Sequence, residues 1–426
     1  LLSYHAPSLD LLLRLCASGD YLSGMLIGQP GMIDELLDSL LLETLPDRTA
    51  LADSLAELCH GAEDIDPILH AFRSSLHLSV GVRDLLGKVQ ISETHRTLSD
   101  VAEVLLERVV HHEQAALDRR YGMPTIEVDG ELRRCELVVL ALGKLGGREP
   151  NYHSDLDLVF LYEAEGFTGE SRLDRRTSNQ HYFLQLSSKV LQRLSQVGPF
   201  GRLYEVDARL RPTGRSGSIA VSFEQFGKYF ASGAGELWER LALVKARPVT
   251  GSPAARDQAM RIVRQAQFDT PWAPQMASQL AAMRLRLQEN ATVSNLKRGA
   301  GGTMDIEFAA QMLQLRYGGE HSQVLVPGTL QAFERLAAGG FLEPEEAQAW
   351  AGAYRTLRAV EARLRLMNTA ARHDLPDDPT ELARLAYVLR ESDAAEVARR
   401  ITRCRYETRQ RFDLLVARLA GEGIDR

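Results

Sequence analysis

Residues 141–163, ALGKLGGREPNYHSDLDLVFLYE, place a glycine-rich loop and a lysine ahead of two aspartates that lead into an apolar run. Side chains of a strand alternate between its faces, so Asp155 and Asp157 share one side while Leu156 and Leu158 share the other. Two carboxylates this close repel each other unless a cation lies between them. The stretch therefore predicts a buried strand that begins at a cation site. A pair of solvated aspartates at a turn is the alternative.

Magnesium is the cation that this pattern favours. Mg²⁺ takes hard oxygen ligands, usually one or two carboxylates together with waters and substrate phosphates. The GKLGG loop offers closely spaced backbone N–H groups of the kind that cradle phosphates, and Lys144 adds a positive charge. The loop is neither a P-loop nor a dinucleotide-binding G-x-G-x-x-G, so alone it is a weak signal.

A third carboxylate comes from YEVDARLRP, which has the period-two alternation of a second strand. On such a strand Asp207, Arg209, Arg211 and Glu205 share one face. A carboxylate beside two arginines can hold a metal and neutralise phosphate, whereas a ladder of surface ion pairs is the alternative.

Together these segments predict two-metal phosphoryl or nucleotidyl transfer. The expected metal ligands are Asp155, Asp157 and Asp207, and the arginines and the glycine loop are expected to hold a triphosphate. Asp207 could also act as a general base.

Composition limits the classes of partner. The 426 residues carry 50 basic and 57 acidic side chains, a net charge of −7, so we expect no nucleic-acid partner. No apolar run is long enough to predict a membrane span. Four widely spaced cysteines indicate free thiols in a reducing cytoplasm. Because the chain starts with Leu1 in mid-pattern, we expect it to be part of a longer protein.

The patterning predicts an α+β protein that is mostly helical. Leucine periodicity predicts a helical region over 1–121, including helices in GMIDELLDSLLLETL and in a segment capped at Ser99 or Asp100. Strands separated by helices, beginning with CELVVLALG before the glycine loop, predict a catalytic domain over 122–251. Amphipathic segments predict a helical bundle over 252–426.

Four segments of the sequence resemble those of a known family. GKLGGREPNYHSDLDLVF, LYEVDARLRPTGRSG, LWERLALVKARPVTG and GGTMDIEFAAQMLQLRYGG are similar, in this order, to blocks of the glutamine synthetase adenylyltransferases. QPGMIDELLDSL resembles the helical segment before that family's second catalytic half. The family belongs to the DNA polymerase β-like nucleotidyltransferase superfamily, so the resemblance implies a polymerase-β-like core of a small mixed sheet with helices.

The resemblance also implies an activity and a site. Family members carry one half that attaches AMP from ATP to a tyrosine of glutamine synthetase and one that removes it by phosphorolysis. DARLRPTG, VKARPV and GGTMDIEF are more similar to the adenylylating half. By position, Asp155, Asp157 and Asp207 match the metal aspartates, while Gly146, Gly147 and Ser154 fall in the nucleotide-binding signature. Regulation by glutamine and the PII signal protein is implied as well.

Three matters stay open in the sequence. The chain could be the deadenylylating half, or a non-catalytic module that binds glutamine synthetase. Asp305 and Glu307 begin a helix after a glycine-rich turn. Asp305 is expected to cap that helix, and the alternative is that the turn closes over the nucleotide or the target tyrosine. Pro150 departs from the family, in which leucine is more common, and stiffens the loop.

Overall fold

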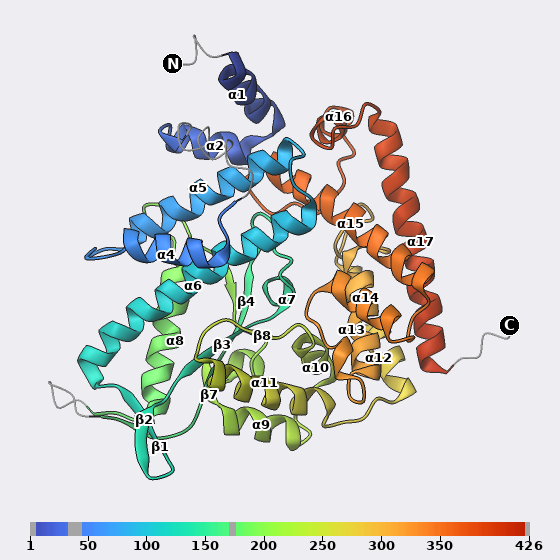
Figure 1. Ribbon diagram of the computed structural model, residues 1–426. Helices are drawn as coiled ribbons and strands as arrows, with labels where there is room; N and C mark the ends of the chain where they lie inside the picture. Colours follow the sequence, from blue (N-terminus) through green and yellow to red (C-terminus); the bar gives the residue numbers. More distant parts are fainter. Residues whose placement is uncertain (1–5, 33–44, 170–175, 422–426) are drawn as a thin grey trace.

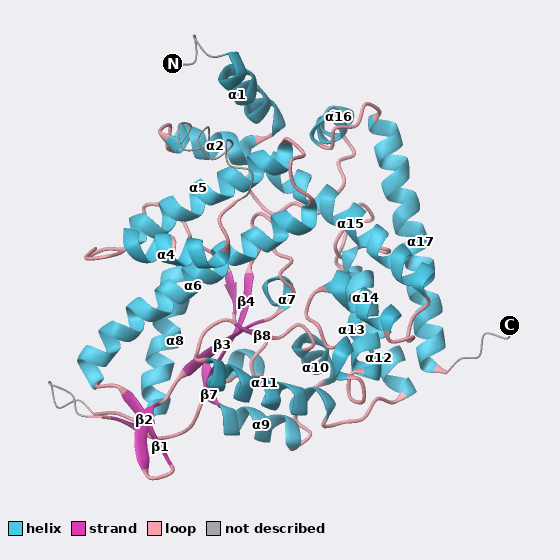
Figure 2. Ribbon diagram, in the orientation of Figure 1, coloured by secondary structure: helices cyan, strands magenta, loops and turns pink. Residues whose placement is uncertain are grey.

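The protein was analysed as a computed structural model that describes residues 6–32, 45–169 and 176–421. Figure 2 shows helices throughout and strands confined to a small part of the fold, so the prediction of a mostly helical α+β protein is confirmed. Among the described residues no helix has the length and apolar character needed to cross a membrane. Most of GMIDELLDSLLLETL lies outside the described residues.

The centre of the fold is an antiparallel pair, β3 (Leu137–Ala141) with β4 (Leu156–Tyr162), which forms the two strands predicted around the glycine loop. The sheet has the order β6-β4-β3-β8, and β7 also pairs with β4. β6 (Val206–Asp207) and β7 (Ala220–Ser222) run parallel to β4, while β8 (Arg247–Pro248) is antiparallel to β3. A second sheet, β2-β1-β5, which the sequence did not predict, contains β1 (Pro124–Val128), β2 (Glu131–Arg134) and β5 (Phe167–Thr168).

Both faces of β4 are buried, which explains its continuous apolar sequence. Leu158 and Phe160 pack into a core shared with α6 and α8, whereas Val159 and Leu161 pack into a core shared with α9 and α11. Figure 1 shows α9 and α11 together on one side of this sheet and α8 on the other. The helices of this segment are α7 (Gly143–Gly146), α8 (Asn179–Ser195), α9 (Phe223–Ala231), α10 (Leu237–Leu243) and the 3-10 turn η1 (Gly214–Ser216).

The N-terminal helices include a long α6 that begins earlier than the sequence predicted. Its first residue is Ile91, which follows Gln90 at the N-cap position, so Ser99 and Asp100 lie inside the helix and not at its start. Asp100 pairs there with Arg148 at 2.6 Å, which satisfies its carboxylate without a cap. The described helices are α1 (Ala6–Ser18), α2 (Asp20–Gly28), α4 (Arg48–Leu58), α5 (Asp66–Leu85) and α6 (Ile91–Tyr121).

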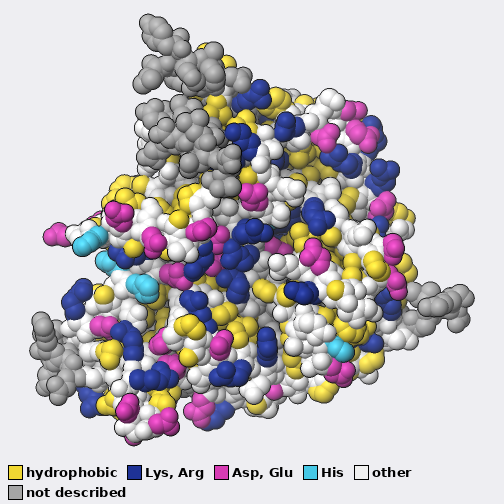
Figure 3. Space-filling model, viewed as in Figure 1, with side chains coloured by type: hydrophobic (Ala, Val, Ile, Leu, Met, Phe, Trp, Pro, Cys, Tyr) yellow, Lys and Arg dark blue, Asp and Glu magenta, His cyan; other side chains and the backbone are white. Residues whose placement is uncertain are grey.

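Basic side chains gather over α6 on the face drawn in Figure 3, among acidic side chains. On this helix Glu103 contacts Arg48 and Arg247, in addition to the Asp100 pair. Positive charge near α6 is thus largely neutralised by acids of the same helix.

The C-terminal helices share a core with the N-terminal α1 and α2, since Leu15 and Leu22 cluster with Trp350 and Leu357. Division of the chain into three domains at residues 121 and 251 stays a prediction. The remaining elements are α11 (Pro253–Phe268), α12 (Pro274–Glu289), α13 (Thr303–Tyr317), η2 (Ser322–Val324), α14 (Thr329–Ala338), α15 (Pro344–Met367), α16 (Pro379–Val388) and α17 (Ala394–Ala420).

Truncation of Trp350 should destabilise the core of these helices. Its side chain is fully buried and stacks on Phe333 with ring centroids 5.7 Å apart. Trp350→Ala leaves a cavity and should lower the free energy of unfolding by about 3–5 kcal/mol. Urea denaturation followed by circular dichroism measures this. Val293→Ala, at a side chain 92% exposed, is the control and should change it by less than about 0.5 kcal/mol.

Candidate active site

The three predicted metal aspartates come together where β4 begins. Asp155 immediately precedes β4, and Asp157 is its second residue. The parallel register of β4 with β6 pairs Asp157 with Asp207. A two-residue strand from a distant part of the sequence thus places the third carboxylate beside the first two.

Electrostatics at this point favour a cation. Burial raises the pKa of Asp157 to about 7, and repulsion from Asp155 and Asp207 adds to the shift. Lys297 and Arg209 oppose it. A divalent cation bound by oxygen ligands would remove the repulsion, so the donor set fits Mg²⁺.

The segment after β6 differs from the predicted strand. Only Val206 and Asp207 are in the ladder, and Arg209 and Arg211 lie in the turns that follow, so the expected shared face is wrong. The reason is local: the backbone N–H of Arg209 donates to Asp207 Oδ1 at 2.8 Å, and its guanidinium binds both carboxylate oxygens. This Asp-centred turn competes with strand pairing.

The two arginines have different partners. Arg209 is exposed and forms an ion pair with Asp207, whereas Arg211 donates to the carbonyls of Gly217 and Ala208. In the described part of the chain no group of three or more His, Cys, Asp or Glu side chains is arranged to hold a metal ion. The role of Asp155, Asp157 and Asp207 as metal ligands therefore stays a prediction.

Gly143, the first residue of the GKLGG loop, was not singled out as a site residue from the sequence, yet a Cβ on it would meet Asp157. Its φ is +53°, a left-handed conformation, and a Cβ there would overlap Asp157 Oδ2. Its signal in the sequence is its place as the first glycine after the β3 strand. Only glycine permits the loop to approach the carboxylate this closely.

The glycines singled out from the sequence lie farther along the loop. A Cβ on Gly146 would overlap the carbonyl of Lys245, and one on Gly147 would lie 3.0 Å from that of Pro327. Close backbone packing thus accounts for both glycines. Ser154 Oγ accepts hydrogen bonds from the Asn151 backbone at 2.8 Å and from Arg365 at 3.1 Å.

Two cations that the sequence reasoning did not select also lie near the aspartates. Lys297 acts on Asp157, and the nearly buried guanidinium of Arg365 is attracted to Asp155. Lys297 belongs to the glycine-rich NLKRGAGG segment, which was a usable signal. Arg365 lies in the amphipathic α15, where the sequence gives no sign of its role.

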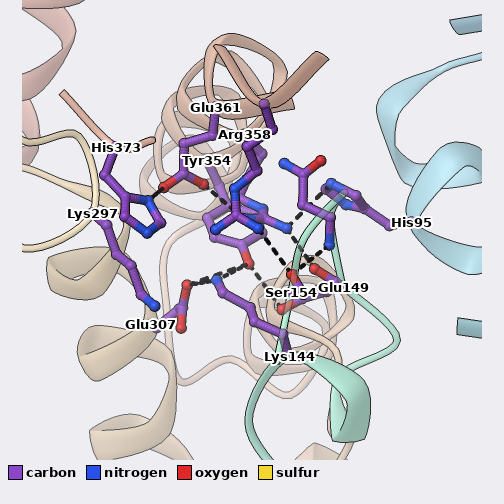
Figure 4. A network of polar contacts seen from close by, with 12 residues as sticks. His95, Lys144, Glu149, Ser154, Lys297, Glu307, Tyr354, Arg358, Glu361 and His373 are labelled. Carbon is purple, nitrogen blue, oxygen red and sulfur yellow. Dashed lines mark hydrogen bonds and ion pairs between the residues drawn. The ribbon is translucent and has the colours of Figure 1, made fainter. Parts of the chain in front are cut away.

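Lys144 lies in a buried polar network and not on an open loop. Its ammonium makes an ion pair with Glu307 and lies 3.3 Å from the hydroxyl of Tyr354, as Figure 4 shows. Burial lowers the pKa of Lys144 to about 8, although the charge of Glu307 opposes this. The lysine therefore joins the glycine loop to α13 and α15.

Glu149 is the centre of the same network. Its carboxylate accepts from Lys245 at 2.9 Å, from the Thr329 backbone at 2.6 Å and from Tyr354 at 2.8 Å. Arg358 donates to the Glu149 carbonyl and pairs with Glu361 at 2.6 Å. These bonds fix the loop before the aspartates to the C-terminal helices.

The acids of α13 thus have separate partners. Asp305 is fully buried, forms an ion pair with Arg284 at 2.6 Å and accepts from the Gly301 backbone at 2.7 Å. It braces the glycine-rich turn, in keeping with the capping interpretation. Glu307 points to Lys144.

Comparison with known proteins identifies the family of the chain. The profile described as glutamate-ammonia ligase adenylyltransferase matches residues 9–262, so the chain belongs to that family. A profile described as PII-uridylyltransferase matches residues 275–419.

Two curated relatives carry the name bifunctional glutamine synthetase adenylyltransferase/adenylyl-removing enzyme. The one from Thioalkalivibrio sulfidiphilus is 34% identical over 85% of this chain and 39% of its own length. The one from Hahella chejuensis is 32% identical over 87% of this chain and 40% of its own length. The chain thus spans about two fifths of the length of these relatives.

The contact at Gly143 gives a stability prediction. Gly143→Ala should lower the free energy of unfolding by at least about 1–2 kcal/mol, because the left-handed backbone and Asp157 both reject a Cβ. Gly352→Ala is the matched control: it lies in α15 with no atom within 4 Å of the added Cβ, and should stabilise by about 0.5–1 kcal/mol. Urea denaturation of both variants measures the contrast.

The Lys144–Glu307 pair gives a pH prediction. Burial raises the pKa of Glu307, but Lys144 and Lys245 outweigh it and lower the pKa from 4.5 to about 2. A carboxyl with a lowered folded-state pKa contributes stability above its unfolded pKa and loses it as the pH falls. Glu307→Gln should therefore cost about 3 kcal/mol at pH 7.

The difference between wild type and Glu307→Gln should shrink as the pH falls from about 4.5 toward 2. Urea midpoints across a pH series measure it. Glu63→Gln, at an exposed acid of a loop, serves as control and should show no such gap. A constant difference between the two proteins across the series would contradict the pairing.

Proposed function

We propose that the chain transfers AMP from ATP to a tyrosine hydroxyl of glutamine synthetase in a Mg²⁺-dependent reaction. The observation that carries the proposal is the register that sets Asp157 opposite Asp207, with Gly143 against the same carboxylate. Membership of the glutamate-ammonia ligase adenylyltransferase family supports the reaction class and the target.

The reaction forms a bond between the tyrosine oxygen and the α-phosphorus and breaks the bond from that phosphorus to the β-phosphate oxygen, so pyrophosphate leaves. Asp155 and Asp157 would hold Mg²⁺, which supplies charge neutralisation at the phosphates. Lys297 and Arg365 bring positive charge to the same carboxylates. Asp207 is the neighbouring carboxylate that can take the hydroxyl proton.

The network around Glu149 serves this reaction by holding the loop. Lys144 reaches Glu307 and Tyr354, so its contribution is to position the GKLGG segment. The arginines after β6 keep Asp207 and its turn in place. A nucleotide that displaced Arg209 from Asp207 would gain a guanidinium for its phosphates and free a carboxylate.

The adenylylating direction is favoured by the DARLRPTG, VKARPV and GGTMDIEF segments. The chain has one set of these motifs, whereas the curated relatives are named for two activities. The proposal includes a cytoplasmic location and regulation by glutamine and PII. The PII-uridylyltransferase profile over residues 275–419 favours a link to PII.

The experiment incubates the chain with unmodified glutamine synthetase, Mg²⁺ and ATP labelled in the α-phosphate, with and without glutamine and PII. Label on glutamine synthetase is expected. ADP release from adenylylated glutamine synthetase and phosphate, without forward transfer, would identify the deadenylylating half. Binding of glutamine synthetase without either reaction would identify a non-catalytic module.

Asp157→Asn should reduce label transfer at least about 100-fold, because the metal site loses a charged ligand. Asp53→Asn, at an exposed acid of α4, is the matched control and should transfer label at the wild-type rate. Circular dichroism should show the same helical content in both variants. Wild-type activity of Asp157→Asn would refute the assignment.

A further inference from the structure

A cavity of about 490 Å³ lies next to β4, on the side away from the aspartates. Leu156 lines it, and since side chains alternate along a strand, Asp155 and Asp157 point to the opposite side. None of Asp155, Asp157 and Asp207 is among its lining residues. Ser154, which precedes Asp155, and Glu205, two residues before Asp207, do line it, so the cavity adjoins the candidate metal site from the other side of the strand.

The walls of the cavity combine several parts of the chain, among them α6 and the segment that follows α15. Tyr21 of α2 and Arg73 and His77 of α5 form one wall, and the segment before β6 contributes Tyr204. Asn151 comes from the loop that leads into β4. Figure 1 shows α2 and α5 adjacent above this end of the sheet.

Four polar groups in these walls are buried and have no hydrogen-bond partner among the described residues. Three of them are Nε2 of His77, Nδ2 of Asn151 and the hydroxyl of Tyr204, on side chains that are 5%, 3% and 9% exposed. Nε of Arg73 is likewise buried and unpartnered. A buried polar group without a hydrogen bond costs free energy, so groups gathered around one cavity indicate a ligand.

The hydrogen bonds that these side chains already make show which of their atoms are free to act as donors. The hydroxyl of Tyr21 lies 2.8 Å from Nδ1 of His77; when it donates to that nitrogen, Nε2 carries the ring proton. Oδ1 of Asn151 already accepts from the Tyr152 backbone at 2.9 Å, which leaves the amide NH₂ as a donor. The cavity therefore presents two N–H donors and a hydroxyl to an acceptor.

The charge and shape of the cavity limit the chemical class of acceptor that it can bind. Burial lowers the pKa of His77 well below its usual value, so this donor is neutral. Arg73 lies over the Tyr204 ring, 5.7 Å from its centroid, and supplies one positive charge, whereas Arg202 is near the acidic Glu205 at 3.7 Å. Mostly neutral donors beside one guanidinium suit a monoanionic group better than a phosphate dianion. Aromatic rings and Leu156 provide an apolar wall.

We propose that this cavity binds a small organic carboxylate, whose oxygens accept hydrogen bonds from His77, Asn151 and Tyr204 beside the guanidinium of Arg73. Asn151 lies four residues before Asp155 on the same loop. Occupancy would therefore fix the loop that leads into the candidate metal site. Its effect on AMP transfer rests on the proposed function, whereas binding itself does not.

The test uses isothermal titration of the chain with benzoate, succinate and inorganic phosphate, in the absence of nucleotide. At least one of the two carboxylates should bind saturably with one site per chain, and more tightly than phosphate. Tyr204→Phe removes only the unpartnered hydroxyl and should weaken that binding about fivefold. Asn151→Asp replaces the donor by a carboxylate of the same shape and should abolish it.

Tyr387→Phe, at an exposed tyrosine of α16 outside the cavity, is the matched control and should bind the carboxylate like wild type. Absence of saturable carboxylate binding up to about 10 mM would mean that water alone fills the cavity, and overturns the proposal. Equal affinity in wild type and both cavity variants, or tighter binding of phosphate, overturns it as well. Because the assay contains no ATP or glutamine synthetase, its outcome is independent of the transferase activity.

Discussion

The burial of Glu149 is the constraint on which the arrangement of this protein depends. A carboxylate that is 7% exposed must be paired and hydrogen-bonded, or it costs several kcal/mol. Its partners are Lys245 before β8, Thr329 at the start of α14 and Tyr354 in α15. One side chain thus ties the loop between β3 and β4 to helices that follow it by about two hundred residues in the sequence. Around it the cations Lys144, Lys245 and Arg358 are matched by the anions Glu149, Glu307 and Glu361.

The single strand β4 separates two different environments. At the start of β4, Asp155 and Asp157 lie on one side, and a bound cation would relieve the repulsion between them. Leu156 lies on the other side and borders a cavity whose unpartnered donors a hydrogen-bond acceptor would satisfy. Strand alternation produces this division, because neighbouring residues face opposite sides at a spacing of one residue. The segment of residues 142–155 borders both the aspartates and the cavity. Its anchoring by Glu149 therefore fixes the position of one wall of each.

Much of the fold and part of the site could be predicted from the sequence. The apolar runs of β3 and β4 and the helical spacing of leucines were visible in the sequence. The position of Asp155 and Asp157 on one side follows from the alternation of side chains along a strand. The arginines after Asp207 could not be placed this way, because a turn centred on the Asp207 carboxylate replaced the expected strand. The start of α6 was missed because Asp100 finds an ion-pair partner in Arg148, far along the chain, and needs no cap role. The roles of Gly143 and Arg365 became visible only through contacts with Asp157 and Asp155.

By itself, the sequence determined which residues alternate, where the chain turns and which carboxylates share a side, since these depend on neighbours a few residues apart. It also carried the motifs that relate the chain to its family. Only the tertiary structure decided that Asp207 pairs with Asp157, that Lys144 is held by Glu307, and that His77, Asn151 and Tyr204 surround one cavity. These contacts join residues separated by dozens to hundreds of positions. Their energy comes from burial and charge pairing across segments, which no local pattern records.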